Sequence, residues 1–212
     1  MKKFLLFLLL AFVLVQANAQ DETLKKFSKS YFRSDPFAGT FSGFLNHLLK
    51  DPSIIDKKIE QRTDTSFFYF GGKYLNFNPF FFKPKKVEVV LTETEVRYSE
   101  DSPLIDTIYV YQVIAQTDFT PEGMEEVKKE FNRILHQYKK KFYSSNTQDL
   151  TDKQGKVVGN FANFFIPYQA VAPITIAWGK MDGENSAVLN ILIRLKSSDN
   201  YAVLPNPLYQ SQ

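Results

Sequence analysis

Hydrophobic residues in this chain repeat with two different periods, and this change of period constrains its fold more than any other feature. Met124, Val127 and Phe131 begin a series spaced three and four residues apart, as on one face of an α-helix. Val87, Val89 and Leu91 instead recur at every second residue, as on the buried face of a β-strand. A chain that contains both helical and strand-like segments is predicted to form an α+β domain. We expect an antiparallel sheet of about seven strands with two or three helices packed on it.

Two segments carry the clearest helical signals. Thr120 can cap a helix whose first position is Pro121, which the missing backbone N–H of proline suits. Apolar residues at helical spacing also predict a helix over residues 36–50, which ends before a proline. Residues 21–32 form either a further helix or a polar amino-terminal arm.

Strand-like runs occupy much of the remaining sequence. Gly71-Gly72 can supply the positive φ angles of a tight turn, so residues 66–70 and 73–77 are expected to form a hairpin. The polar stretch 143–156 is expected to be a loop, and residues 182–185 a hairpin turn. The other predicted strands cover residues 87–96, 105–115, 160–166, 174–178 and 187–195.

A faint internal repeat links the two halves of the chain. Residues 45–49 echo residues 131–135, and residues 76–82 echo residues 160–166. The echo predicts two similar halves, each a helix, an aromatic strand and a hairpin. Coincidence is the alternative, because the chain has 21 phenylalanines.

The first nineteen residues have the pattern of a cleavable signal peptide. Lys2 and Lys3 precede an apolar run over residues 4–15, and Ala17 and Ala19 form a small-x-small cleavage site. We therefore expect cleavage after Ala19 and a periplasmic or secreted protein. The apolar run is too short for a membrane span, which needs about 20 residues, and no later run is long enough.

The predicted organisation follows from these segments. Residues 1–19 are the signal peptide, residues 20–196 a single α+β domain, and residues 197–212 an extended tail. The two halves of the repeat would be residues 36–116 and 120–196.

Composition excludes several classes of function. The chain has no cysteine, so disulfides, thiolate metal sites and cysteine nucleophiles are absent. The formal net charge is +3, of which Lys2 and Lys3 contribute two, and this near balance argues against a nucleic-acid partner. No motif for a cofactor is present, and none is expected.

No reaction is indicated by the ionisable residues. His47 and His136 fall outside the apolar stripes of their helices and are expected to be solvated. Glu93 and Glu95 share one face of a predicted strand, which suits the paired carboxylates of a glycosidase. Such a pair also protects a strand edge against aggregation, and this interpretation is favoured. We expect no catalytic residue and no metal site.

The aromatic residues are the best remaining signal. Nine aromatic side chains fall within residues 67–82, and successive strand residues point to opposite faces of a sheet. Some rings therefore need cover from a helix, from a second subunit or from a ligand. Core packing is the simpler explanation. The candidate binding rim comprises Phe80, Phe81, Phe82, Phe164, Phe165 and Tyr168.

The sequence thus favours an exported, non-catalytic binding or interaction module that acts through an aromatic-rich face. Its partner would be a hydrophobic ligand, a glycan or another protein. One alternative is a hydrolase of envelope carbohydrate or peptide that uses Glu93, Glu95 or an arrangement of aspartates that one sequence does not reveal. A second alternative is a structural subunit that buries its aromatic residues in a homodimer.

Overall fold

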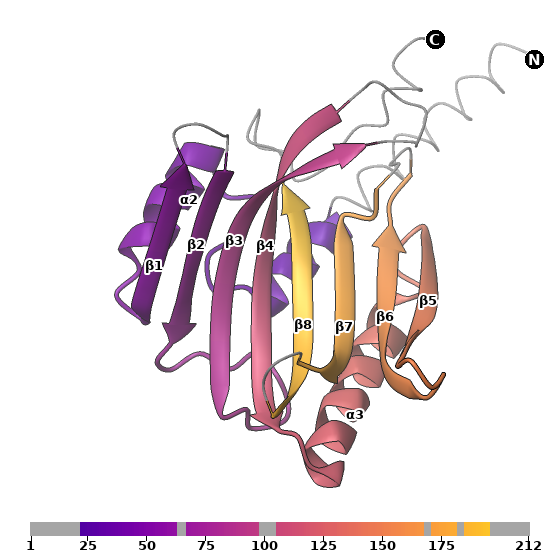
Figure 1. The fold of residues 1–212 in the computed structure, drawn as a ribbon. Helices are drawn as coiled ribbons and strands as arrows, with labels where there is room; N and C mark the ends of the chain where they lie inside the picture. Colours follow the sequence, from indigo (N-terminus) through magenta and orange to yellow (C-terminus); the bar gives the residue numbers. More distant parts are fainter. Residues whose placement is uncertain (1–21, 63–66, 98–104, 168–170, 182–184, 196–212) are drawn as a thin grey trace, which may run out of the picture.

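The structure is built around one eight-stranded antiparallel sheet (Figure 1). It is a computed structural model, and it describes residues 22–62, 67–97, 105–167, 171–181 and 185–195. The predicted signal peptide, the tail over residues 197–212 and most of the turn at 182–185 lie outside the described residues. The α+β class is confirmed, with eight strands where about seven were expected.

The strands form two meanders that meet in the middle of the sheet, in the order β1-β2-β3-β4-β8-β7-β6-β5. The first meander is β1 (Ile54–Arg62), β2 (Phe67–Tyr74), β3 (Lys86–Arg97) and β4 (Ile105–Asp118). The second is β5 (Ser144–Thr151), β6 (Val157–Phe165), β7 (Ile174–Lys180) and β8 (Ser186–Leu195). The last strands of the two meanders, β4 and β8, pair with each other at the centre.

A helix precedes each meander: α2 (Phe41–Lys50) leads into β1, and α3 (Pro121–Tyr138) leads into β5. The two halves therefore share one order of elements. The sequence echo does not follow that order throughout, because residues 76–82 come after β2 whereas most of residues 160–166 lie in β6. An internal repeat stays a prediction.

The helices begin where their caps allow. Thr120 caps α3 as predicted, because its Oγ1 accepts a hydrogen bond from Gly123 N at 3.1 Å. Thr40 caps α2 in the same way, so this helix starts five residues later than predicted. The delay has a local cause: Asp35 accepts a hydrogen bond from Phe37 N, and Gly39 has a φ of 85°. A further helix covers residues 22–31, where a helix or an arm was expected.

The expected hairpin at Gly71-Gly72 was wrong, since both glycines lie inside β2. Neither has a positive φ. A Cβ at Gly72 would clash with the side chain of Ile54 on β1, and a Cβ at Gly71 would clash with the ring of Tyr69. Close packing, not a turn, therefore explains these glycines.

The loop expected over residues 143–156 was also wrong, because most of it forms β5 and the turn into β6. Asp152 closes this turn by accepting hydrogen bonds from Gln154 N and Lys156 N, both at 2.9 Å. Gly155 takes the positive φ of 79° that the turn requires. Strand β1 was not predicted at all; a bulge between Ile55 and Lys58 breaks its alternation.

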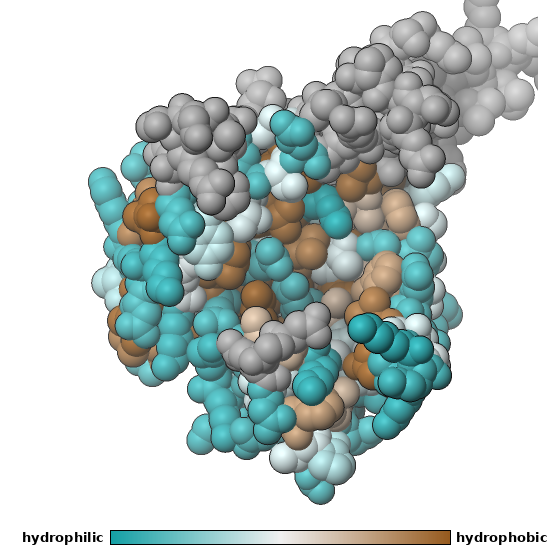
Figure 2. Space-filling model, viewed as in Figure 1, coloured by the Kyte–Doolittle hydropathy of each residue, from teal (hydrophilic) through white to brown (hydrophobic). Residues whose placement is uncertain are grey.

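The helices all lie on one face of the sheet, behind it in Figure 1. Alternate residues of the central strands point to that face and are buried there, and Leu24, Leu48, Val127 and Phe131 from the helices pack in the same core. On β8 the buried set comprises Ala187, Leu189, Ile191, Ile193 and Leu195. The other face carries no helix from the described part of the chain, and Figure 2 shows polar and apolar side chains mixed across it. In the described residues no helix has both the length and the hydropathy that a membrane crossing requires.

Candidate functional site

The loop after β2 puts two of the six predicted rim residues into the core. Phe80 and Phe82 are 6% and 9% exposed, and their ring centroids lie 5.8 Å apart. Asn78 shapes this loop, because its amide donates to Phe82 O at 2.8 Å and accepts from Phe80 N at 3.0 Å. Phe81, between the two buried rings, is 81% exposed.

Phe164 and Phe165, two further rim residues, lie on β6 and not in this loop. Phe164 is fully buried on the helix-covered face, where its ring packs against Phe27 and Phe142. Phe165 follows it on β6 and therefore points to the uncovered face. Tyr168 lies outside the described residues. The structure thus separates the five described side chains instead of joining them in one rim.

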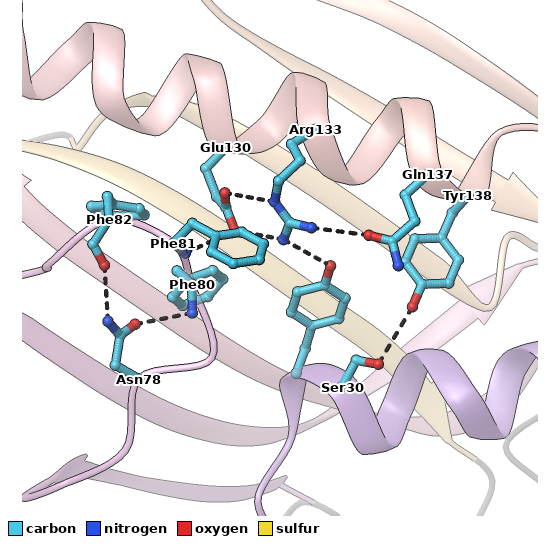
Figure 3. A network of polar contacts seen from close by, with 10 residues as sticks. Ser30, Asn78, Phe80, Phe81, Phe82, Glu130, Arg133, Gln137 and Tyr138 are labelled. Atoms are coloured by element: carbon cyan, nitrogen blue, oxygen red, sulfur yellow. Dashed lines mark hydrogen bonds and ion pairs between the residues drawn. The ribbon is translucent and has the colours of Figure 1, made fainter.

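A polar network fixes the exposed Phe81 to α3 (Figure 3). Glu130 Oε1 accepts a hydrogen bond from Phe81 N at 3.3 Å and another from Arg133 Nη2 at 2.7 Å. The Arg133 guanidinium lies 4.3 Å from the centre of the Phe81 ring and donates to Tyr31 Oη at 3.2 Å. Glu130 raises the pKa of Arg133, and burial raises the pKa of Tyr31 to about 12. These contacts hold the loop after β2 against α3 and the first helix, and we call this segment, residues 78–82, the Phe81 loop.

The residues considered for hydrolysis, Glu93 and Glu95, line none of the three grooves described below. Glu93 and Glu95 lie on one face of β3, opposite Tyr109 and Thr107 of β4. Burial raises the pKa of Glu93.

A serine that precedes α2 lies near a histidine in the last turn of that helix. Ser34 Oγ is 3.5 Å from His47 Nδ1, but Ser34 is only 2% exposed, so its hydroxyl does not reach a substrate. His47 and His136 are both exposed, as predicted. The described residues contain no cluster of histidine and carboxylate side chains suited to a metal ion.

A groove beside the only tryptophan is the best candidate site. It lies between α3 and strands β5, β6 and β7, and its volume is about 470 Å³. Sites for small molecules usually have volumes in this range and combine apolar walls with a few polar groups. The lining residues are Lys128, Phe131, Asn132, Leu135, Thr147, Asp149, Val157, Asn160 and Trp178.

The groove follows from the register of the strands and from one flank of α3. Asn160 of β6 pairs with both Asp149 of β5 and Trp178 of β7, so the three side chains lie in one row across the sheet. Lys128 and Asn132 lie one turn apart on the helix and border the row. At 100° per residue, this flank of α3 lies opposite the flank that carries Glu130 and Arg133. The groove and the Phe81 loop therefore lie on opposite flanks of α3.

Charged and amide groups surround the tryptophan. Asn160 Nδ2 donates to Asp149 Oδ1 at 2.7 Å, which fixes the carboxylate and leaves its other oxygen as an acceptor. Lys128 Nζ lies 5.9 Å from the centre of the Trp178 ring, at the outer limit of a cation–π contact. Trp178 is half-buried, so part of its ring faces the groove. A ligand with both apolar faces and hydroxyl groups would match this lining.

Two further grooves fit a ligand less well. In one, of about 450 Å³, Arg33 and Asp51 already pair with each other at 3.3 Å. The other, of about 580 Å³, contains four lysines, of which Lys85 pairs with Asp118 and Lys86 with Glu88. Neither contains an aromatic ring beside a fixed carboxylate–amide pair.

Sequence reasoning missed the groove at Trp178. Its residues come from four elements spread over fifty positions, from Lys128 to Trp178, and no local motif joins them. The single tryptophan on a predicted strand was the one available signal. Comparison of the chain with protein-family models, with curated proteins and with solved structures gives no match.

Proposed function

We propose that this protein is an exported, non-catalytic module that binds a carbohydrate in the groove beside Trp178. The observation that carries the proposal is the Trp178 ring set next to the hydrogen-bonded Asp149–Asn160 pair. Sugar rings present apolar C–H faces to an aromatic ring and vicinal hydroxyls to carboxylates and amides. Export rests on the signal-peptide pattern of residues 1–19.

Binding is favoured over hydrolysis by the number of carboxylates in the groove. A glycosidase normally uses two carboxyl groups on either side of the scissile bond. Among the residues that line the groove, Asp149 is the one carboxylate. Glu93 and Glu95, the residues of the hydrolase alternative, lie on β3, in the other half of the sheet.

The unique tryptophan makes the proposal directly testable. Residues 20–212 are titrated with neutral, acidic and amino-sugar oligosaccharides while tryptophan fluorescence is recorded. Because Trp178 is the only tryptophan, tryptophan fluorescence reports on the surroundings of this one ring. We expect a saturable change with at least one class of sugar. The absence of saturable binding by every class at millimolar concentration would overturn the proposal.

Calorimetry with variants then locates the binding site. Trp178→Ala is expected to weaken binding of the sugar by tenfold or more, since it removes the ring surface. Phe81→Ala is the matched control, because this exposed ring lies on the opposite flank of α3. Loss of binding in Phe81→Ala alone would move the site to the Phe81 loop and contradict the groove.

A further inference from the structure

Arg194 lies on the face of the sheet that no described helix covers. The odd-numbered residues of β8 from Ala187 to Leu195 are buried against the helices, so Arg194 points the other way. Its neighbour across the β4–β8 pairing is Val110, and Leu192 lies two residues earlier on the same face of β8. Arg194 is only partly exposed there, and burial lowers its pKa.

Neutral groups hold one end of this guanidinium in place. Arg194 Nη1 donates to Ala172 O at 2.8 Å and to Thr175 Oγ1 at 2.9 Å. Thr175 is 8% exposed and donates its own hydroxyl proton to Asn163 Oδ1 at 2.6 Å, so the direction of each hydrogen bond is fixed. Within the described residues, no aspartate or glutamate forms an ion pair with Arg194.

Arg133 in the same chain shows what the free edge of Arg194 can bind. Arg133 uses Nε and Nη2, one edge of the guanidinium, to hold both carboxylate oxygens of Glu130 at 2.8 and 2.7 Å. The same Nε and Nη2 edge of Arg194 has no hydrogen-bond partner in the described part of the chain. A partly buried guanidinium with an open edge favours a planar, bidentate anion.

We propose that Arg194 anchors a second site, on the uncovered face of the sheet, that binds the carboxylate of a small aliphatic acid. Arg194 Nε and Nη2 take the two carboxylate oxygens, while Nη1 stays on Ala172 and Thr175. Val110 and Leu192 lie beside the guanidinium and provide apolar surface for the aliphatic part of the acid. The residues that flank Arg194 on β4 and β7 are uncharged, which favours a monoanion over a phosphate dianion.

The site is tested on residues 20–212 with hexanoate as the probe, and hexanol and inorganic phosphate as comparisons. Calorimetry and thermal unfolding are measured for each. We expect hexanoate to bind saturably and to raise the unfolding temperature with concentration, whereas hexanol and phosphate do neither. Equal binding of phosphate would identify a general anion site and overturn the carboxylate assignment, and absence of hexanoate binding would overturn the site.

Two variants of Arg194 separate the contribution of its bidentate hydrogen bonding from that of its charge. Arg194→Lys keeps the charge but loses the bidentate edge, so hexanoate affinity should fall about tenfold, and Arg194→Gln should abolish binding. Arg194→Gln also removes a partly desolvated charge, so it is expected to fold with unchanged or raised stability. Lys153→Gln, in the exposed β5–β6 turn, is the matched control and should bind as the parent does. Unchanged binding in Arg194→Gln would exclude Arg194 as the anchor.

The two proposed sites can fail independently, because Trp178 lies on the helix-covered face and Arg194 on the other. Trp178→Ala should bind hexanoate normally, and Arg194→Gln should bind sugar normally. If Trp178→Ala loses hexanoate binding while Arg194→Gln keeps it, the acid occupies the groove, and the Arg194 site is excluded.

Discussion

Arg133 Nε and Nη2 hold Glu130 in a bidentate ion pair, at 2.8 and 2.7 Å from its two carboxylate oxygens. The two partners differ in their access to water, since the Glu130 side chain is 4% exposed and that of Arg133 is 31% exposed. The arginine can therefore be solvated alone, but the carboxylate cannot. This asymmetry decides which substitution is costly.

Arg133→Met should lower the free energy of unfolding by about 3 kcal/mol, because it leaves the buried carboxylate without its cation. Glu130→Gln should cost less, about 1 kcal/mol, since the amide oxygen still accepts from Phe81 N. Urea unfolding of both variants and of the double variant gives the coupling energy. Equal costs for the two single variants would contradict the asymmetry.

The two glycines of β2 should respond differently to alanine. Gly72→Ala places a methyl group against the buried Ile54 side chain, so we expect a loss of about 2 kcal/mol. Gly71→Ala meets only the ring of Tyr69, a partly exposed side chain that can rotate away, and should cost under about 1 kcal/mol. Denaturant unfolding of both variants measures the difference. The reverse order would contradict the packing of β2 against β1.

Stability should fall in acid partly through Asp51. Burial alone would raise the pKa of this carboxyl, but hydrogen bonds from Ser53 and the charge of Arg33 bring it below its usual value. A folded-state pKa below the unfolded value, about 3.9, means that the stabilisation is present above that pH. It is lost as the pH falls through the folded-state pKa. Unfolding of Asp51→Asn between pH 2 and pH 6 should therefore show a shallower decline than the parent; an identical decline would exclude this contribution.

The groove carboxylate should matter more for binding than for folding. Asp149→Leu removes the acceptor at the exposed edge strand and should reduce sugar affinity about tenfold, with little change in the unfolding temperature. Gln148→Ala is the matched control, because residue 148 is adjacent on β5 but points to the opposite face. Titration calorimetry measures both. A comparable loss in Gln148→Ala would place the ligand on the uncovered face instead.

The predictable parts of the fold were those in which local pattern and burial agree. The start of α3 was predictable because the capping Thr120, the proline after it and the apolar stripe all indicate the same helix. Strands β3 and β8 were predictable from apolar residues at every second position, which do face the core, and β4 from a run that is apolar on both faces.

The elements that the sequence did not predict are those whose conformation depends on contacts with neighbouring strands. Every residue of β5 is exposed, so its pairing with β6 leaves no hydrophobic pattern to read. In β1, the bulge at Asp56, whose φ is 54°, shifts the alternation by a residue. Gly71-Gly72 has the composition of a turn, and only the Ile54 side chain on the next strand explains why it is not one.

The candidate site could be anticipated only as a class. Surplus aromatic residues suggested a binding surface, but three of the six candidate rim residues, Phe80, Phe82 and Phe164, are buried in the core. The Trp178 groove depends on the register that aligns Asp149, Asn160 and Trp178 across three strands. Register is a property of the assembled sheet, so no single segment of sequence contains it.

The central pairing of β4 with β8 sets the order in which the chain can complete its fold. Val113 pairs with Ile191, a partner 78 positions later in the sequence. Until residues 186–195 have been synthesised, β4 has unpaired backbone groups along one apolar edge, a feature that promotes intermolecular pairing. A truncated product that stops before Ser186 would therefore not be a smaller stable domain but an aggregation-prone intermediate. A chain that crosses a membrane amino terminus first would need protection of this edge until its last strand arrives.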